Sequence, residues 1–281
     1  MSFLDRIEEC NAHDLARFRP FRVAAARVGW VAEGFAARLA AFPGVFRIDD
    51  GEVALADALG SYAARTQAVD GALRALAAEG EIPGWRDEPY PVGTGFREAP
   101  LFEMERAAVP RFGVRAYGVH VNGYVRKAGE IHLWIARRAR GKQTYPGMLD
   151  NAIAGGQPVG MGLMENVVKE AGEEAGVPPE LAAHAVAVGA ISYTAQEGDR
   201  LKPDVMFTFD LELPEGFAPR NTDGEIEEFV LMPADEVMRI TSETRAFKFN
   251  CALVNIDFFV RHGLIPPEHP DYLAIVQGLR R

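Results

Sequence analysis

Three glutamates gather in the segment that runs from Gly155 to Val177, GGQPVGMGLMENVVKEAGEEAGV. Apolar residues recur there at the three- and four-residue spacing of an amphipathic helix, which turns by about 100° per residue. On such a helix Glu170, Glu173 and Glu174 project together on one face. Carboxylates this close repel one another unless a cation lies between them, and a hard divalent ion suits oxygen ligands. The pattern predicts a Mg²⁺ or Mn²⁺ site with coordination positions left for water and substrate phosphates.

A solvated acidic helix face is the simpler explanation, because most charge runs are of that kind. The surroundings of these acids favour a site. They follow a Gly-Gly turn, and Gly176 stands where a helix C-cap glycine is expected.

The segment resembles the Nudix box, whose usual pattern is G-x5-E-x7-R-E-U-x-E-E-x-G-U with U aliphatic. Gly155 opens the pattern, and KEAGEEAGV at residues 169–177 closes it in register. Met161 replaces the first glutamate and Lys169 the arginine, two residues that commonly form a salt bridge in the family. Glu165 is placed to pair with Lys169 instead, at the favourable i, i+4 spacing.

The composition indicates an ordinary globular protein of 281 residues, 48% hydrophobic and 25% charged. No apolar run approaches the ~20 residues that span a membrane, so we expect no membrane association. The acidic N-terminal segment does not resemble a signal peptide, and Cys10 and Cys251 lack the spacing of a disulfide framework or a metal site. We therefore expect a reducing, cytoplasmic location. The net charge of −10 argues against nucleic acid as a partner.

Residues 1 to about 105 are predicted to form a separate α+β unit, followed by a larger domain over residues 106–281. In the first unit we expect helices at Phe3–Cys10, Gly29–Ala41 and Leu59–Ala78, and strands at Val45–Ile48 and Val53–Leu55 around an Asp49–Gly51 turn. The segment IPGWRDEPYPVGTG (residues 82–95) is the candidate linker. Arg86, in this segment, is interpreted as a surface residue or, alternatively, as a residue that faces a ligand.

Alternating and helical patterns in the larger domain predict a mixed sheet flanked by helices. Expected strands are residues 113–126, broken by an Asn-Gly pair, then 131–136, 185–193, 204–213 and 225–232. Expected helices are the box helix from Met164, residues 235–240 and residues 247–263, with a packed tail at 266–281. The Nudix resemblance implies the same α+β architecture, an α/β/α sandwich.

The resemblance extends beyond the box to nearly the whole chain. The segments ERAAVPRFGVRAYGVHVNGYV, KQTYPGMLDNAIAGG, DGEIEEF and FKFNCALVNIDFFVRHG are similar to a long-form Nudix subfamily with an N-terminal DUF4743-type domain. Its eukaryotic relatives are associated with thiamine pyrophosphokinase. The N-terminal domain would act as a lid, a substrate selector or the surface of a homodimer.

The resemblance implies a pyrophosphatase: metal-dependent hydrolysis of a diphosphate linkage in a small phosphorylated metabolite. It assigns metal binding to Gly155, Glu170, Glu173 and Glu174, and catalysis to Glu173, Glu174 and a later glutamate. We favour Glu225 for the last role, since alternation would put Glu225 and Glu227 on one strand face and Glu228 on the other. The basic residues that precede the box are candidates for phosphate binding, with solvated loop cations as the alternative: Arg137, Arg138 and Lys142.

Thiamine diphosphate or an oxidised analogue is the specific substrate that the subfamily resemblance suggests. A general hydrolase of ADP-ribose or NADH is the alternative within enzymes. An isopentenyl-diphosphate isomerase needs an active-site cysteine, and Cys10 and Cys251 lie far from the box in the sequence. The alternative of another class is a Nudix-fold module that binds a ligand without catalysis.

Overall fold

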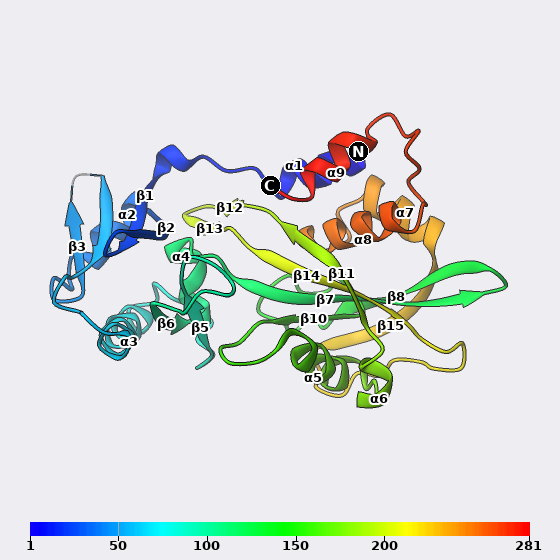
Figure 1. Ribbon diagram of the computed structural model, residues 1–281, viewed down its shortest axis with the longest axis horizontal. Helices are drawn as coiled ribbons and strands as arrows, with labels where there is room; N and C mark the ends of the chain where they lie inside the picture. The colour runs from blue at the N-terminus through cyan, green and yellow to red at the C-terminus, as the bar shows by residue number, and fades with distance from the viewer. Residues whose placement is uncertain (50) are drawn as a thin grey trace.

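The computed structural model describes residues 1–49 and 51–281, so Asp50 of the expected turn lies outside the described residues. An N-terminal unit and a larger C-terminal unit lie side by side (Figure 1). The chain is an α+β protein, as predicted.

The N-terminal unit is built on a sheet that, among the described residues, has the strand order β2-β1-β4-β3. Its strands are β1 (Phe18–Val23), β2 (Ala26–Ala32), β3 (Phe46–Asp49) and β4 (Glu52–Leu55). Helices α2 (Glu33–Leu39), α3 (Tyr62–Ala78) and α4 (Val109–Phe112) and the 3₁₀ turns η1 (Leu15–Arg17) and η2 (Arg106–Ala108) complete it. The rings of Phe21, Phe35 and Phe46 surround Phe112, at centroid distances of 5.1, 5.4 and 5.8 Å.

Two predictions for this unit are wrong. The expected helix Gly29–Ala41 begins only at Glu33, because the preceding residues pair with β1 and Val28 and Val31 are buried in the sheet. The expected linker at residues 82–95 contains β5 (Pro89–Val92), which pairs with β6 (Phe102–Glu105). Tyr90 and Val92 point into the N-terminal core, while the prolines occupy the alternate positions of an edge strand.

The C-terminal unit is built on a mixed sheet with seven strands in the described part of the chain. The strand order is β11-β14-β7-β8-β15, with β10 on β7 and β9 on β8, and β14 runs parallel to β7. Its strands are β7 (Tyr117–Lys127), β8 (Glu130–Arg138), β9 (Leu149–Asp150), β10 (Ile153–Gly156), β11 (Val186–Ser192), β14 (Val205–Glu212) and β15 (Ile226–Pro233). The small hairpin of β12 (Ala195–Glu197) and β13 (Arg200–Lys202) was not predicted.

Helices cover both faces of this sheet, as the α/β/α sandwich requires. They are α5 (Leu163–Ala175), α6 (Pro179–Ala182), α7 (Ala234–Glu243), α8 (Phe249–Arg261) and α9 (Tyr272–Gly278). Strand β7 shows the layering by its alternation. Val119 and Val121 pack with Val167 of α5, whereas Tyr124 packs with Phe258 of α8 at a centroid distance of 5.6 Å.

Strand β7 also overturns the expected break at its Asn-Gly pair. The Asn122 side chain donates to Asp210 on the neighbouring strand at 3.2 Å. A Cβ on Gly123 would lie 3.1 Å from that of Ala152, so glycine serves close packing here. Both residues therefore continue the strand.

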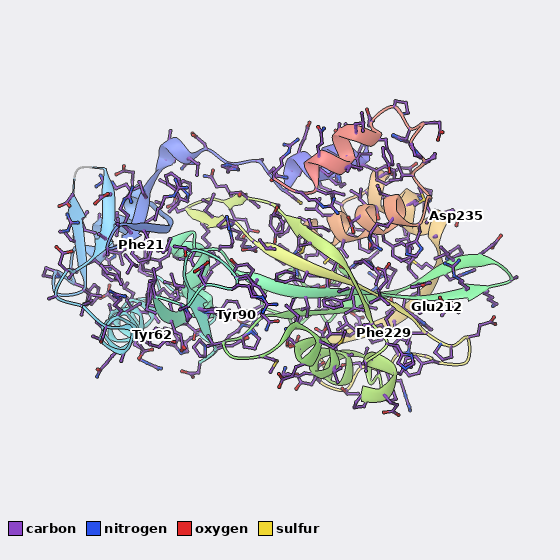
Figure 2. The ribbon with its side chains drawn as sticks, viewed as in Figure 1. Phe21, Tyr62, Tyr90, Glu212, Phe229 and Asp235 are labelled. Carbon is purple, nitrogen blue, oxygen red and sulfur yellow. The ribbon has the colours of Figure 1, made fainter. Side chains whose placement is uncertain are left out.

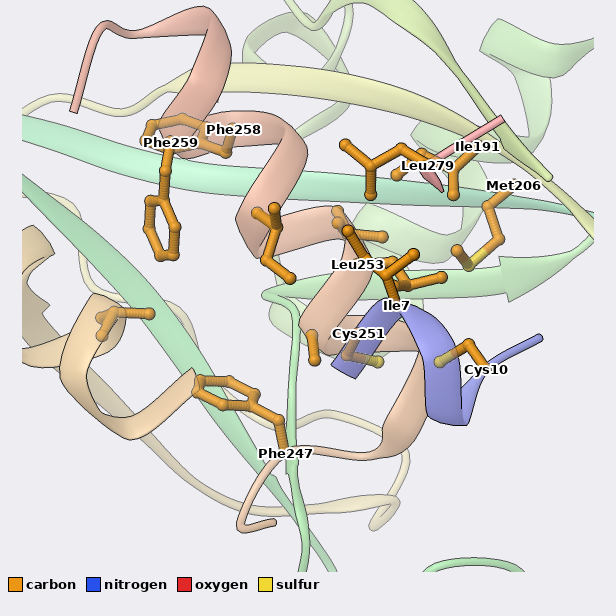
Figure 3. Packing of buried hydrophobic residues seen from close by; sticks show 14 of the residues in the cluster. Ile7, Cys10, Ile191, Met206, Phe247, Cys251, Leu253, Phe258, Phe259 and Leu279 are labelled. Carbon is orange, nitrogen blue, oxygen red and sulfur yellow. The ribbon is translucent and has the colours of Figure 1, made fainter. Parts of the chain in front are cut away.

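The first helix, α1 (Phe3–Glu9), packs against the C-terminal unit although it belongs to the N-terminal part of the sequence. It lies beside α9 (Figure 1). Figure 3 shows Ile7 and Cys10 near Leu253 of α8 and Leu279, which directly follows α9. The Cys10 thiol donates to the Phe249 carbonyl at 3.2 Å.

The domain boundary near residue 105 stays a prediction. The N-terminal core continues through Phe112 and Val114, and α1 lies outside it. A deletion of residues 1–105 would therefore remove Ile7 and Cys10 from the core of the C-terminal unit. No described helix is both long and apolar enough to cross a membrane.

We predict that Ile7→Ala lowers the free energy of unfolding by about 2–4 kcal/mol, because it leaves a cavity in a fully buried site. Urea denaturation followed by circular dichroism measures the change. Leu273→Ala, at a 71% exposed position of α9, is the control and should change the free energy by less than about 0.5 kcal/mol. Equal effects of the two substitutions would show that α1 does not dock on the C-terminal core.

Candidate metal and diphosphate site

Helix α5 approaches strand β10 so closely that a side chain at Gly155 would displace a box glutamate. A Cβ on Gly155 would overlap the side chain of Glu170, whose carboxyl group rests on the Gly155 backbone. The carboxylate of Glu174, one turn further along α5, accepts a hydrogen bond from the Ala154 N–H at 2.8 Å. The resemblance assigned Gly155, Glu170 and Glu174 to metal binding, and the structure brings all three together.

Burial dominates the electrostatics of these acids. It raises the pKa of the Glu174 carboxyl to about 8, and the charges of Asp150 and Glu170 act in the same direction. Burial also raises the pKa of Glu170, whose neighbours include Glu173 and, from the N-terminal unit, Arg106. Desolvated carboxylates, together with the Gly155 carbonyl that the resemblance assigns to metal binding, would form an all-oxygen donor set that favours a hard divalent cation. The residues present therefore fit such an ion.

Glu173 lies apart from the other two acids. Its side chain is 54% exposed, against 16% for Glu170, and the Lys169 ammonium group contacts Glu173 at 2.6 Å and Glu170 at 3.1 Å. The expectation that all three acids share one face is thus only partly met, and Glu173 reaches the group from its edge.

The expected pair between Glu165 and Lys169 is absent from the described contacts. Glu165 accepts the Gly162 N–H at 3.2 Å, as a residue in the first turn of a helix does. Lys169 turns instead to the glutamates that follow it.

The two arginines before the box do not act as one phosphate site. Arg138 is buried and bonds Asp150 at 2.8 Å as well as the Thr144 and Tyr145 carbonyls. Its geometry does not support the prediction of substrate binding, since these partners hold the loop before β9. Arg137 is directed to the opposite side of β8 and pairs with Glu228 at 2.7 Å.

Lys142 does reach the acids. Burial lowers the pKa of its ammonium group to about 8, with a further contribution from the Arg138 charge, and its charge acts on Glu174. Lys142 is paired with Glu225, so the predicted catalytic glutamate reaches the site through this lysine.

Asp223 is the loop acid that the sequence reasoning missed. Its electrostatic neighbours are Lys142 and Glu173, and Thr222 beside it bonds the Glu173 carbonyl. The alternation expected after Glu225 is interrupted by a bulge between Ile226 and Glu228. Within the segment DGEIEEF, the first acid, Asp223, thus interacts electrostatically with Glu173 of the box.

His120, Asp150 and Cys251 form a buried cluster whose ligand atoms all lie within 4.8 Å of one another. The spacing of these three residues in the sequence does not indicate such a cluster. The Asp150 carboxylate is already paired with Arg138 and accepts the Cys251 thiol at 2.7 Å and the Asn151 N–H at 2.9 Å. These contacts satisfy the carboxylate and place a guanidinium beside it, so we interpret the cluster as a structural network.

Cys251, which is far from the box in the sequence, is linked to it through Asp150, whose carboxylate accepts the thiol and whose charge acts on Glu174. Burial nevertheless raises the pKa of the Cys251 thiol well above its usual range, so the thiol stays protonated. An isomerase that uses this cysteine is not supported.

The N-terminal unit also reaches the box. Figure 2 shows Tyr90 between strand β5 and the large sheet, and a Cβ on Gly156 would overlap its hydroxyl oxygen. The Cζ atom of Arg106 would lie 3.6 Å from the same Cβ position and sits 5.5 Å from the centre of the Tyr90 ring. Neither residue could be predicted from local patterns, because both contacts are made between distant segments.

A pocket of about 170 Å³ opens beside this contact, between residues 91–100 and residues 157–161. Phe96, Val159 and Met161 give it an apolar lining, and Arg115 and Gln157 add polar groups. Met161, the departure from the Nudix pattern, is therefore a wall of the pocket.

Comparison with known proteins decides the family. Residues 116–253 match the NUDIX domain, and residues 2–116 match the domain of unknown function DUF4743. The chain is 43% identical over 282 residues to Nudix hydrolase 24, chloroplastic, of Arabidopsis thaliana, covering 99% of the chain and 77% of that protein. This chain belongs to the Nudix hydrolase family.

Other relatives agree. Nudix hydrolase 20, chloroplastic, of Arabidopsis thaliana is 44% identical, again over 99% of this chain and 77% of the relative. The uncharacterized protein YJR142W of Saccharomyces cerevisiae is 34% identical over 85% of this chain and 75% of its own length. The present chain is accordingly an enzyme, a pyrophosphohydrolase, and its family uses divalent metals.

Among solved structures, the NUDIX domain of Shewanella oneidensis NrtR, determined with ADP ribose, is 11% identical. It aligns with a TM-score of 0.42 over 54% of this chain and 90% of that chain. The likeness concerns the fold.

We predict that Arg138→Gln lowers the free energy of unfolding by about 3–5 kcal/mol, because it leaves the buried Asp150 carboxylate without its guanidinium. Arg137→Gln, one residue away, breaks an exposed ion pair and should cost at most about 1 kcal/mol. Urea titrations of both variants test the assignment. A mild effect of Arg138→Gln together with a raised KM would restore Arg138 as a substrate-binding residue.

A second prediction concerns pH. Burial, aided by the Lys248 charge, lowers the pKa of His120 to about 4, against about 6.5 in an unfolded chain. The unfolded state therefore binds the proton more readily, so His120 contributes stability above about pH 6.5 that is lost as the pH falls towards 4. Between pH 7 and 4.5 the wild type should lose about 2 kcal/mol more than His120→Gln, as measured by urea denaturation. Parallel pH profiles would contradict a neutral, buried His120.

Proposed function

We propose that this Nudix hydrolase cleaves the diphosphate group of a small, ring-bearing metabolite with the help of Mg²⁺ or Mn²⁺. The observation that carries the proposal is the convergence of the Glu170 and Glu174 carboxylates on the backbone of Ala154 and Gly155. Glu170, Glu174 and the Gly155 carbonyl would hold the ion, with Glu173 at its edge. A bound divalent ion neutralises phosphate charge and lowers the pKa of water.

The chain's own groups supply the rest of the chemistry. Water adds to a phosphorus atom and the bond from that phosphorus to the bridging oxygen breaks, so the departing phosphate keeps the bridging oxygen. A box glutamate, Glu174 or Glu173, orients the water and takes its proton. Lys142 adds positive charge near Glu174, and Glu225 holds Lys142 in place.

The pocket between the two units is placed to hold part of the organic group of the substrate. Complete ligands fill sites of about 300–1,000 Å³, so a pocket of about 170 Å³ suits one ring of a larger substrate. Thiamine diphosphate and its oxidised analogues carry two rings, of which the pocket would hold one, and the subfamily resemblance is what favours them. ADP-ribose or NADH hydrolysis is the second candidate, because the diphosphate site serves any diphosphate.

Glu174→Gln should lower kcat by at least a hundredfold while the fold survives, because the change keeps the volume and removes the carboxylate that would bind the ion. Phosphate release with Mg²⁺ in excess measures the rate, and circular dichroism checks the fold. Near wild-type turnover would remove the box as the catalytic site. A wild type inactive on every diphosphate would favour a binding module.

The substrate is tested by a panel of thiamine diphosphate, oxidised thiamine diphosphate and ADP-ribose at equal Mg²⁺. We expect the highest kcat/KM for a thiamine compound. Met161→Glu should raise KM for that compound about tenfold or more, because it places a charge in the apolar pocket. A preference for ADP-ribose, unaffected by Met161→Glu, would overturn the thiamine assignment and the role of the pocket.

A further inference from the structure

One arginine of the N-terminal unit lies beside the box, and a second lies on a turn that approaches Lys142. The guanidinium group of Arg106 lies beside Gly156, and its charge acts on Glu170. The turn that carries Arg86 contacts the Lys142 loop, since a Cβ on Gly84 would lie 2.9 Å from the Gln143 side chain, and the charge of Arg86 acts on Lys142. The N-terminal unit thus places positive charge near the acids that would bind the metal ion.

Glu105 holds both arginines in place. This buried carboxylate accepts the backbone N–H groups of Arg86 at 3.0 Å, Glu88 at 3.2 Å and Ala107 at 3.1 Å. The turn that carries Arg86 is thereby fastened to the turn that carries Arg106. Such pre-organisation lowers the entropy that is lost when the two side chains bind a ligand.

The Arg106 side chain is held and yet accessible. It donates to Glu88 at 2.8 Å, packs over the Tyr90 ring at 5.5 Å and remains 40% exposed. A guanidinium group has five N–H donors, and the bond to Glu88 is the one hydrogen bond of this side chain among the described residues. The remaining donors suit an anion with several oxygens, for which a planar fork is well shaped.

We propose that Arg106 and Arg86 bind the phosphate oxygens of the substrate from the N-terminal unit, while the box acids would hold the metal ion, and so make the active site a composite of both units. This inference rests on the proposed function and deepens it, since it assigns phosphate recognition to the N-terminal unit. Glu105 is a positioning residue in this arrangement. The substrate's diphosphate lies between the Glu170–Glu174 edge of α5 and the two arginines.

The test compares Arg106→Gln, Arg106→Lys and Arg86→Gln in the full-length protein with a control, Arg74→Gln. Arg74 is an exposed arginine of the same unit, paired with Asp70 at 2.9 Å and Asp87 at 3.2 Å. Calorimetry with inorganic pyrophosphate in excess Mg²⁺ gives the affinity, with phosphate release followed in parallel to detect hydrolysis, and steady-state kinetics on the best substrate of the panel gives KM and kcat.

We expect Arg106→Gln to weaken pyrophosphate binding about ten- to a hundredfold and to raise KM by a similar factor. Arg106→Lys should restore part of the affinity, because it returns the charge without the fork. Arg86→Gln should show a smaller loss, and Arg74→Gln should match the wild type.

Thermal unfolding of each variant separates a lost contact from a lost fold. Wild-type affinity and KM in a folded Arg106→Gln protein would overturn the inference, and so would a loss that Arg74→Gln shares. If the wild type binds pyrophosphate through Arg106 but hydrolyses no diphosphate, the proposed function fails and this inference stands.

Discussion

The close approach of helix α5 to strand β10 is the contact on which the rest of the site depends. It is possible because Gly155 and Gly156 lack the Cβ atoms that would collide with Glu170 and Tyr90. The approach takes two carboxylates out of water and sets them against backbone polar groups, and burial is what makes a cation favourable there. From the other side, the same glycine pair lets the N-terminal unit come into contact with the box.

The remaining packing serves to keep that contact in place. One side of the sheet buries α5 through Val119, Val121 and Val167. The other side carries α8 and a polar network in which Arg138 neutralises Asp150 and the Cys251 thiol donates to the same carboxylate. Helix α1 crosses from the beginning of the chain to the α8 side, so the two units are linked by more than the segment that joins them. This arrangement explains why point substitutions, and not deletion of the N-terminal region, are suited to test its role.

The parts of the structure that could be predicted are those that local sequence patterns determine. The box helix and its acids follow from a periodicity over a few residues, and most strands of the large sheet follow from alternation. Predictions failed where a distant partner overrode the local pattern. Pairing with β1 turned residues 26–32 into a strand, and the bond from Asn122 to Asp210 carried β7 through an expected turn.

The same limit applies to the site. Glu165 caps the helix because the N–H groups of the first turn have no partner within the helix. The predicted i, i+4 pair with Lys169 did not take these groups into account. Tyr90, Arg106 and Asp223 reach the box only through tertiary contacts, so no spacing in the sequence could single them out. The cytoplasmic location and the homodimer surface stay predictions from composition and resemblance.

The central claim is that the glycine-dependent contact between α5 and β10 creates a divalent-metal site. Mn²⁺ affinity, measured by electron paramagnetic resonance on wild type, Gly155→Ala and Gly71→Ala, tests it most directly. Gly71 lies in α3 with no atom within 4 Å of an added Cβ, so its variant should bind Mn²⁺ as the wild type does. In Gly155→Ala the added methyl group must displace Glu170, and the affinity should fall at least tenfold, about 1.4 kcal/mol. Unchanged affinity in a folded Gly155→Ala protein would contradict the account.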